Sequence, residues 1–142
     1  MAISTETKAT WNQARIVVAP HRQADQKQRI RIALGAKNER LPTVGEKALS
    51  RYYRYLSANL VLPFAAHFPK PTTAEEQTEF CCTVVSLIDP TKYLGDGFDG
   101  IFCKTRKGEY ELNLPLIDLY LPENSRNGQL IEDYWFWLWN WR

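Results

Sequence analysis

The 142-residue sequence is poor in the residues that build disulfide frameworks and metal fingers. It has three cysteines and two histidines, and the adjacent pair Cys81 and Cys82 forms no C-x-x-C motif. An odd cysteine count argues against a disulfide framework, and a structural zinc site needs four closely placed ligands. We therefore expect small buried thiols in a reducing compartment, with a thiol site of Cys81 or Cys82 and His67 as a less favoured alternative.

Long apolar runs and catalytic signatures are also missing. No run approaches the roughly 20 residues of a membrane span, and the first residues lack the pattern of a secretory signal. The chain contains no G-x-S-x-G, phosphate-loop or H-E-x-x-H motif. Hydrophobic residues make up 44% and charged residues 24%, as in ordinary globular proteins. These features predict a cytoplasmic, non-enzymatic protein without membrane contact.

The small net charge of +2 hides a strong asymmetry between the two halves of the chain. Residues 1–71 carry twelve Lys/Arg and four Asp/Glu, a net charge of +8. Residues 72–142 carry six Lys/Arg and twelve Asp/Glu, a net charge of −6. Such a division indicates either different partners for the halves or attraction between them.

Residues 1–40 are polar and basic, and we interpret them as an N-terminal arm that is partly flexible. Within it, "ADQKQRIRIALGAKN" fits a strand by its alternation and a helix by Asp25 as cap and Gly35 as terminator. The arm is a candidate surface for nucleic acid or an acidic partner protein, although a solvated tail is the simpler interpretation. The candidate binding residues are Arg22, Lys27, Arg29 and Arg31.

Residues 41–142 predict a helix followed by several short strands. Thr43 and Glu46 form a capping-box pattern, and one apolar face follows with helical spacing at Leu49, Tyr52, Tyr53, Leu56 and Leu60. Strands are predicted in "LVLPFAAHF", as an edge strand because of Pro63, in "TEFCCTVVSLI", and in a hairpin turning at Lys107-Gly108. The fold class is α+β: a small SH3-like antiparallel barrel or bent sheet preceded by one amphipathic helix.

The chain ends in "IEDYWFWLWNWR", where tryptophan occupies every second position. We favour a strand with Trp135, Trp137, Trp139 and Trp141 on one face, although a helical turn is an alternative. Both faces of such a strand are apolar, so the segment is expected to close the core. Only Trp139 and Trp141 remain candidates for an exposed contact.

The loop "GDGFDG" carries Asp96 and Asp99 among three glycines. Calcium prefers several carboxylate and carbonyl oxygens in an adaptable loop. Asp89 upstream and Asp118 after the hairpin add carboxylates if the fold brings them near. The spacing is not that of an EF-hand, and an ordinary glycine-rich turn is the competing interpretation.

The order of these motifs resembles the CcbP-like family of small bacterial calcium-binding proteins over roughly residues 50–142. Three stretches carry the resemblance: the "YRYLSANLVLPFAA" segment, the "DGI" that follows the acidic loop, and "PLIDL" at the end of the hairpin. The matching residues are Tyr53, Tyr55, Leu56, Asn59, Leu60, Leu62, Pro63, Phe64, Ala66, Asp99, Gly100, Ile101, Pro115, Leu116, Asp118 and Leu119. One family carboxylate position, after "PLxDL", is occupied here by Tyr120.

The resemblance implies an SH3-like β-rich body and a non-enzymatic calcium-binding protein that acts as a buffer or sensor. The implied cofactor is Ca²⁺, with Asp96, Asp99, Asp89 and Asp118 as candidate ligands. The alternative function is an interaction subunit whose basic arm binds nucleic acid or an acidic protein, with calcium binding lost. The second reading remains open because function lies in sites and not in folds.

Overall fold

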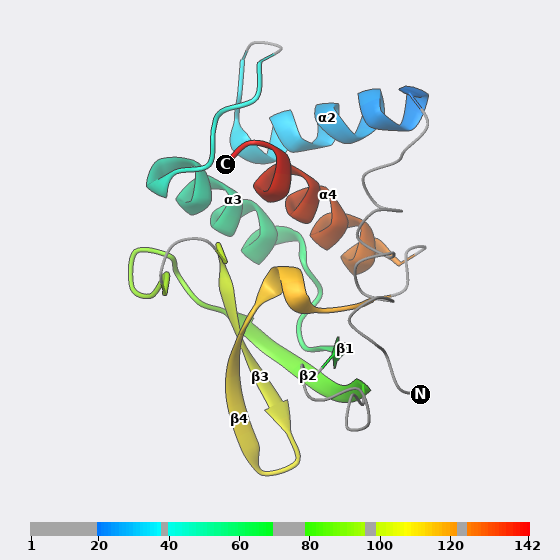
Figure 1. Cartoon of the computed structure of the whole chain (residues 1–142), viewed down its shortest axis with the longest axis vertical. Helices are drawn as coiled ribbons and strands as arrows, with labels where there is room; N and C mark the ends of the chain where they lie inside the picture. Colours follow the sequence, from blue (N-terminus) through cyan, green and yellow to red (C-terminus); the bar gives the residue numbers. More distant parts are fainter. Residues whose placement is uncertain (1–19, 38–39, 70–78, 96–98, 122–124) are drawn as a thin grey trace.

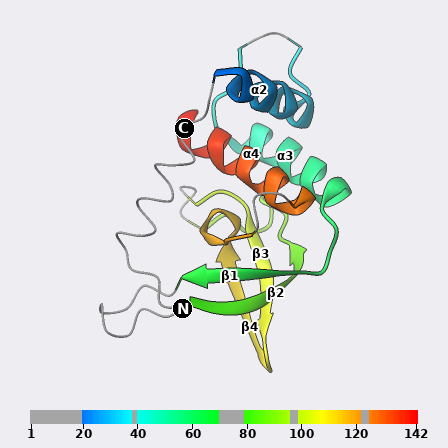
Figure 2. The same cartoon turned by 90° about the vertical axis from the view of Figure 1, so that its right-hand side faces the viewer.

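The computed structural model describes residues 20–37, 40–69, 79–95, 99–121 and 125–142 (Figure 1). Among the described residues, the helices α2, α3 and α4 gather in one half of the molecule and a sheet fills the other half, with α3 and α4 lying between α2 and the sheet (Figures 1 and 2). The predicted α+β class is confirmed, but in the described part of the chain both α2 and α3 precede the sheet and α4 follows it. In chain order the elements are α2 (Pro20–Leu34), α3 (Glu46–Asn59), β1 (Phe64–Pro69), β2 (Glu79–Leu87), β3 (Phe102–Lys107), β4 (Tyr110–Pro115), the 3-10 helix η1 (Leu116–Asp118) and α4 (Arg126–Asn140).

The sheet is open and antiparallel, with the strand order β1-β2-β3-β4. Its strands overlap the predicted ones, although β1 begins four residues after the start of the predicted stretch. The β3–β4 hairpin turns at Gly108, whose φ is +61°. Positive φ is easily adopted by glycine, so the Lys-Gly pair is suited to this turn. A bulge between Val84 and Ser86 shifts the register of β2 against β3.

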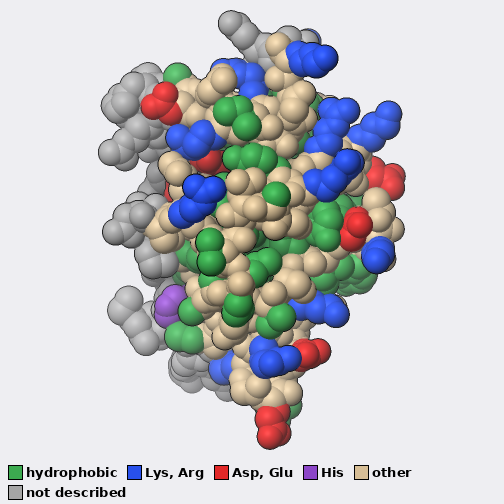
Figure 3. All heavy atoms as spheres, turned by 180° about the vertical axis from the view of Figure 1, so that it is seen from behind, with side chains coloured by type: hydrophobic (Ala, Val, Ile, Leu, Met, Phe, Trp, Pro, Cys, Tyr) green, Lys and Arg blue, Asp and Glu red, His purple; other side chains and the backbone are tan. Residues whose placement is uncertain are grey.

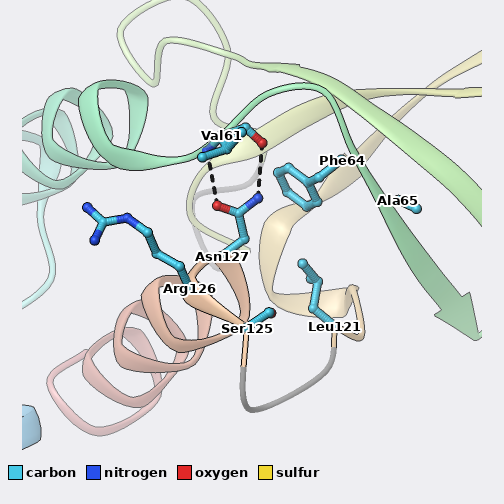
Figure 4. Close-up of a pocket in the computed structure, with 7 residues that line it drawn as sticks. All are labelled: Val61, Phe64, Ala65, Leu121, Ser125, Arg126 and Asn127. Carbon is cyan, nitrogen blue, oxygen red and sulfur yellow. Dashed lines mark hydrogen bonds between the residues drawn. The ribbon is translucent and has the colours of Figure 1, made fainter.

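The outer edge of β1 is shielded from strand addition, in agreement with its predicted edge position. Tyr120 forms an isolated bridge with His67, the two residues exchanging N–H···O bonds of 3.0 and 2.7 Å. Just before the strand, the Asn127 amide accepts from Val61 N and donates to Val61 O, both at 3.0 Å (Figure 4). These contacts satisfy edge groups that would otherwise pair with another chain.

The tryptophan-rich C-terminal segment is a helix, so the favoured strand interpretation was wrong. Ser125 caps α4, its Oγ accepting from Gly128 N at 2.9 Å. A helix that is apolar on all its faces is buried in the protein core. Residues 133–138 of α4 are all buried, and the helix lies between the other helices and the sheet. The expected core position is confirmed, while Trp139 is 45% exposed.

Helix α3 buries the predicted face against α4. Leu49, Tyr52 and Leu56 are at most 2% exposed, and the Tyr52 ring lies 5.1 Å from the Tyr134 ring, edge to face. The capping box does not form, because the helix begins one residue after Gly45, with no side-chain cap. The indole of Trp137 completes the contact by donating to Pro42 O at 2.9 Å.

Helix α2 shows that much of the predicted arm belongs to the folded body. Ile30 and Leu34, one turn apart, are fully buried, and Gly35 ends the helix with a φ of +64°. The helical alternative for this stretch is therefore correct. Residues 1–19 and 38–39 of the arm lie outside the described residues. None of the described helices has the length and apolar composition needed to cross a bilayer.

Candidate metal centre at the acidic end of the sheet

The strand topology places three of the four predicted metal ligands at the same end of the sheet. Asp89 follows β2, Asp99 precedes β3, and Asp118 lies in η1 directly after β4. Because β2, β3 and β4 are successive antiparallel neighbours, the end of β2, the start of β3 and the end of β4 coincide. The fourth, Asp96, lies outside the described residues.

Backbone hydrogen bonds join these three strand ends. Ile88 N donates to Phe102 O at 2.8 Å, and Leu116 N donates to Ile101 O at 2.9 Å. Each bond lies within two residues of a predicted ligand. The positions of the three aspartates are therefore set by the sheet and not by the loop alone.

Asp89 sits in a tight turn that keeps it ionised. Its Oδ1 accepts from Thr91 N at 2.9 Å and from Thr91 Oγ1 at 2.8 Å, which is an Asx turn. The Thr91 N–H, then the Thr91 hydroxyl, lowers the pKa of Asp89 below its ordinary value, and Lys92 and Arg54 add smaller effects of the same sign. The carboxylate is charged at neutral pH, as a metal ligand must be.

Asp99 directly precedes Gly100, whose backbone packs tightly against α4. Gly100 has a φ of +71°, and a Cβ there would overlap the Tyr134 hydroxyl oxygen and lie 2.9 Å from a Leu138 methyl. The next residue, Ile101, donates its N–H to the Tyr134 oxygen at 2.7 Å. Burial, above all, raises the pKa of Tyr134, so its hydroxyl stays protonated. The exit of the acidic loop is thus anchored to the helical layer.

The first residues of the loop pack against the ring of Phe102. Tyr93 meets the Phe102 ring edge to face at 4.9 Å. Gly95, with a φ of +60°, lies over the same ring, because an added Cβ would be 3.2 Å from it. No local sequence pattern indicates these supporting roles of Tyr134 and Phe102, because both residues have the pattern of ordinary core aromatics.

The chemistry of the donors fits calcium, but the described side chains supply only part of a site. Carboxylates are the hard oxygen ligands that calcium prefers. Asp99 and Asp118 are half-buried, and no three His, Cys, Asp or Glu side chains of the described residues gather closely enough to hold a metal ion. A complete site therefore needs Asp96, or oxygens of the loop backbone, in addition to these carboxylates.

Three of the four predicted partner-binding residues of α2 have described side chains, and each of them makes a contact within the chain. Arg29 makes two bonds to the buried Asp133 of α4, from Nε at 2.7 Å and from Nη2 at 3.0 Å. Lys27 Nζ lies 5.8 Å from the centroid of the Trp141 ring, and Arg31 binds Gln28 on the surface. The backbone of Arg22 lies in the first turn of α2, and its side chain is outside the described part.

An apolar hollow of about 290 Å³ lies beside β1, at the beginning of α4 (Figure 4). Phe64, Ala65 and Leu121 supply much of its wall, and Asn127 is engaged with the Val61 backbone. Its polar groups come from Ser125, which caps α4, and Arg126, which donates to Asn59 Oδ1. Such a lining has no carboxylate to ligate a cation.

The three cysteines differ in exposure, which corrects the expectation that all are buried. Cys81 is exposed, with its Sγ 3.5 Å from His67 Nδ1, its cross-strand neighbour. Cys82 and Cys103 are buried, and burial is the main cause that raises the pKa of both thiols, that of Cys103 to about 12. The Cys81 thiol and the His67 ring of the less favoured thiol site are thus in contact. The thiols of Cys82 and Cys103 are inert at neutral pH.

The fold and these residues define a small α+β protein with an acidic sheet end braced by a helical layer. The chain belongs to the CcbP family, since that family's model, described as calcium binding, matches residues 42–138. Among solved structures, that of Anabaena CcbP superposes with a TM-score of 0.60 at 16% identity, over 86% of this chain and 93% of that chain. A calcium-binding protein in its calcium-binding form gives 0.58 and 19%, over 86% and 95%. At these identities the likeness concerns the fold, and no curated protein matches the sequence.

Proposed function

We propose that this protein binds calcium without catalysing a reaction, at the sheet end that carries Asp89, Asp99 and Asp118, with Asp96 of the same acidic sequence segment as a fourth ligand. The observation that carries the proposal is the family match over residues 42–138. The convergence of three of these aspartates at one end of the sheet supports it. Asp89 and Asp118 come from strand ends, and Asp96 and Asp99 come from the loop between them.

The chemistry of the site favours modest affinity and reversible loading. Few carboxylates and a glycine-rich loop place the expected dissociation constant in the micromolar to millimolar range, roughly 10⁻⁶ to 10⁻³ M. Binding in this range responds to changes in calcium concentration, as a buffer or a sensor must. A sensor additionally needs a conformational response, for which the contact of Gly100 with Tyr134 offers a direct route from the loop to α4.

Isothermal titration calorimetry of the full chain tests the proposal. The wild type should release or absorb heat with calcium, and the double variant Asp96→Asn/Asp99→Asn should weaken binding at least about tenfold, because calcium affinity depends on the number of charged ligands. The matched control is Glu109→Gln/Glu111→Gln, which removes two exposed carboxylates from the β3–β4 hairpin. Silence of the wild type at millimolar calcium, or equal weakening by both variants, refutes the assignment.

A further inference from the structure

A second hollow, of about 380 Å³, lies between the end of α2 and the middle of α3. We call it the α2–α3 hollow. Ile32 and Gly35 of α2 form one side, and Arg51, Arg54 and Tyr55 of α3 form the other. Its volume is at the lower end of that of ligand clefts, which suits one or two side chains of a partner rather than a whole cofactor.

The α2 side of the hollow is aliphatic, because Ile32, Ala33 and Leu34 line it, and the helix end satisfies two of its own carbonyls. Ala36 N donates to Arg31 O at 2.9 Å and Gly35 N donates to Ile32 O at 3.2 Å, which is a Schellman motif. The Ile32 side chain lies beside these two hydrogen-bonded carbonyls and is 59% exposed. The exposed isoleucine therefore offers an apolar contact to a partner.

The α3 side of the hollow is cationic. Arg51 and Arg54 are exposed, lie three residues apart on one helix face, and make no ion pair with any residue that the structure describes. Lys47, one turn before Arg51, is exposed on the same helix. Seen from behind, the helical half of the surface carries more Lys and Arg than Asp and Glu side chains (Figure 3).

We propose that the α2–α3 hollow docks an acidic peptide segment of a partner protein through two carboxylates and one aliphatic side chain. Each guanidinium presents a planar set of donors that matches a carboxylate. The aliphatic side chain covers Ile32 and removes its surface from water. Charge complementarity therefore selects the acidic residues, and the α2 wall selects the apolar residue between them.

Two features favour a peptide over a nucleic acid. Single-stranded nucleic acid needs aromatic platforms for its bases, but the one aromatic residue of the hollow, Tyr55, is half-buried and meets Tyr52 edge on at 6.4 Å. The exposed Ile32 also favours a peptide, because a peptide supplies an aliphatic side chain to cover it and a sugar-phosphate backbone does not.

Fluorescence anisotropy at low salt tests the proposal with a labelled peptide, Gly-Asp-Glu-Leu-Glu-Asp-Gly. The full chain should bind it, and should bind a twin peptide with Asn and Gln in place of the acids at least about tenfold more weakly, because charged hydrogen bonds are the strong ones. Arg51→Glu/Arg54→Glu and the milder Arg51→Gln/Arg54→Gln should each weaken binding by about tenfold or more. The control Lys104→Glu/Arg106→Glu makes the same charge reversal as Arg51→Glu/Arg54→Glu, but on two exposed residues of β3. It should bind the peptide like the wild type.

Methyl NMR locates the contact, since the peptide should shift the Ile32 methyl resonance and leave that of the buried Ile101 unchanged. Equal affinity for both peptides, equal loss in the control variant, or tighter binding of a twelve-nucleotide oligothymidine would each overturn the proposal. Calcium titration of the single variant Arg51→Glu, which leaves the effect of Arg54 on Asp89 in place, should match the wild type. A failure of the docking proposal is therefore distinguishable from a failure of the calcium proposal.

Discussion

Replacing Asp133 by alanine should loosen α2 from the rest of the protein. Asp133 is 4% exposed and accepts three hydrogen bonds from α2, one from Gln26 Nε2 at 3.1 Å and two from Arg29. These are the described side-chain hydrogen bonds between α2 and α4. Their loss removes the polar part of a contact whose apolar part is made by Ile30 and Leu34.

The two partners of Asp133 contribute differently to the expected loss. Gln26 is 5% exposed and its Oε1 has no partner among the described residues, so losing the acceptor of its Nε2 strands a buried amide at a cost of about 1–3 kcal/mol. The Arg29 side chain is 38% exposed, and water can solvate it, so its ion pair adds only about 0–1 kcal/mol. The free energy of unfolding should fall by about 2–3 kcal/mol.

Urea unfolding followed by tryptophan fluorescence measures this loss, because the buried Trp137 reports on the core. The melting temperature should fall by roughly 5–10 °C for a chain of this length. A matched variant, Gln26→Leu/Arg29→Met/Asp133→Leu, replaces the whole network by apolar groups and should recover most of the stability. Stability of Asp133→Ala within about 0.5 kcal/mol of the wild type would refute this account of how α2 is held.

Two further outcomes follow from the structure. Gly100→Ala should destabilise the fold by about 2 kcal/mol or more in a thermal melt, because the new Cβ overlaps Tyr134 and the backbone keeps a positive φ. Gly35→Ala has a similar φ of +64° but open space around the new Cβ, so it should lose only about 1 kcal/mol. Stability should also fall as pH rises from 9 to 12, because the unfolded Cys103 thiol ionises above its ordinary pKa of 9.0 while the folded pKa is about 12. Each pKa unit is about 1.4 kcal/mol, so the loss reaches about 3 kcal/mol at pH 11, two units above the ordinary pKa. Cys103→Ala should flatten this slope in urea titrations at pH 8 and pH 11. Equal destabilisation by the two glycine variants, or an unchanged slope in Cys103→Ala, would contradict these arguments.

The sheet was predictable because its strands carry local signals. β-branched and aromatic runs ended by Asp-Pro and Lys-Gly gave β2, β3 and β4, and Pro63 marked β1 as an edge strand. The α3 face was equally clear from its spacing. Its first residue was not, because Gly45 competes with Thr43 as the cap and the sequence does not show which one the tertiary structure selects.

The helical layer was harder to predict because its patterns are ambiguous on their own. In α4, tryptophan at every second position imitates a strand, and the helix is revealed only by the surfaces that cover it on several sides. In α2, the alternation of Ile30 and Ile32 also imitates a strand, but Ile30 is buried and Ile32 is exposed. Tertiary burial decided both cases.

The candidate metal site was predictable in its residue types and only partly in its placement. The glycine-framed carboxylates pointed to a hard cation, and strand order brings Asp89, Asp99 and Asp118 to one end of the sheet. The Asx turn that holds Asp89 is readable from the threonine two residues later. The contact between Arg29 and Asp133 spans 104 positions, and no local pattern could reveal it.

Amide NMR with added calcium tests the central claim most directly. The seven glycines are spread over the chain, and their amide resonances usually fall in a separate region of the spectrum. Calcium should shift the loop glycines and leave the distant ones nearly unchanged, and Asp96→Asn/Asp99→Asn should move the midpoint of these shifts to at least about tenfold higher calcium. The expected set is Gly95, Gly97 and Gly100, and the reference set is Gly35, Gly45 and Gly108. No shift at millimolar calcium, or shifts centred on the reference set, would contradict the assignment of calcium binding to this end of the sheet.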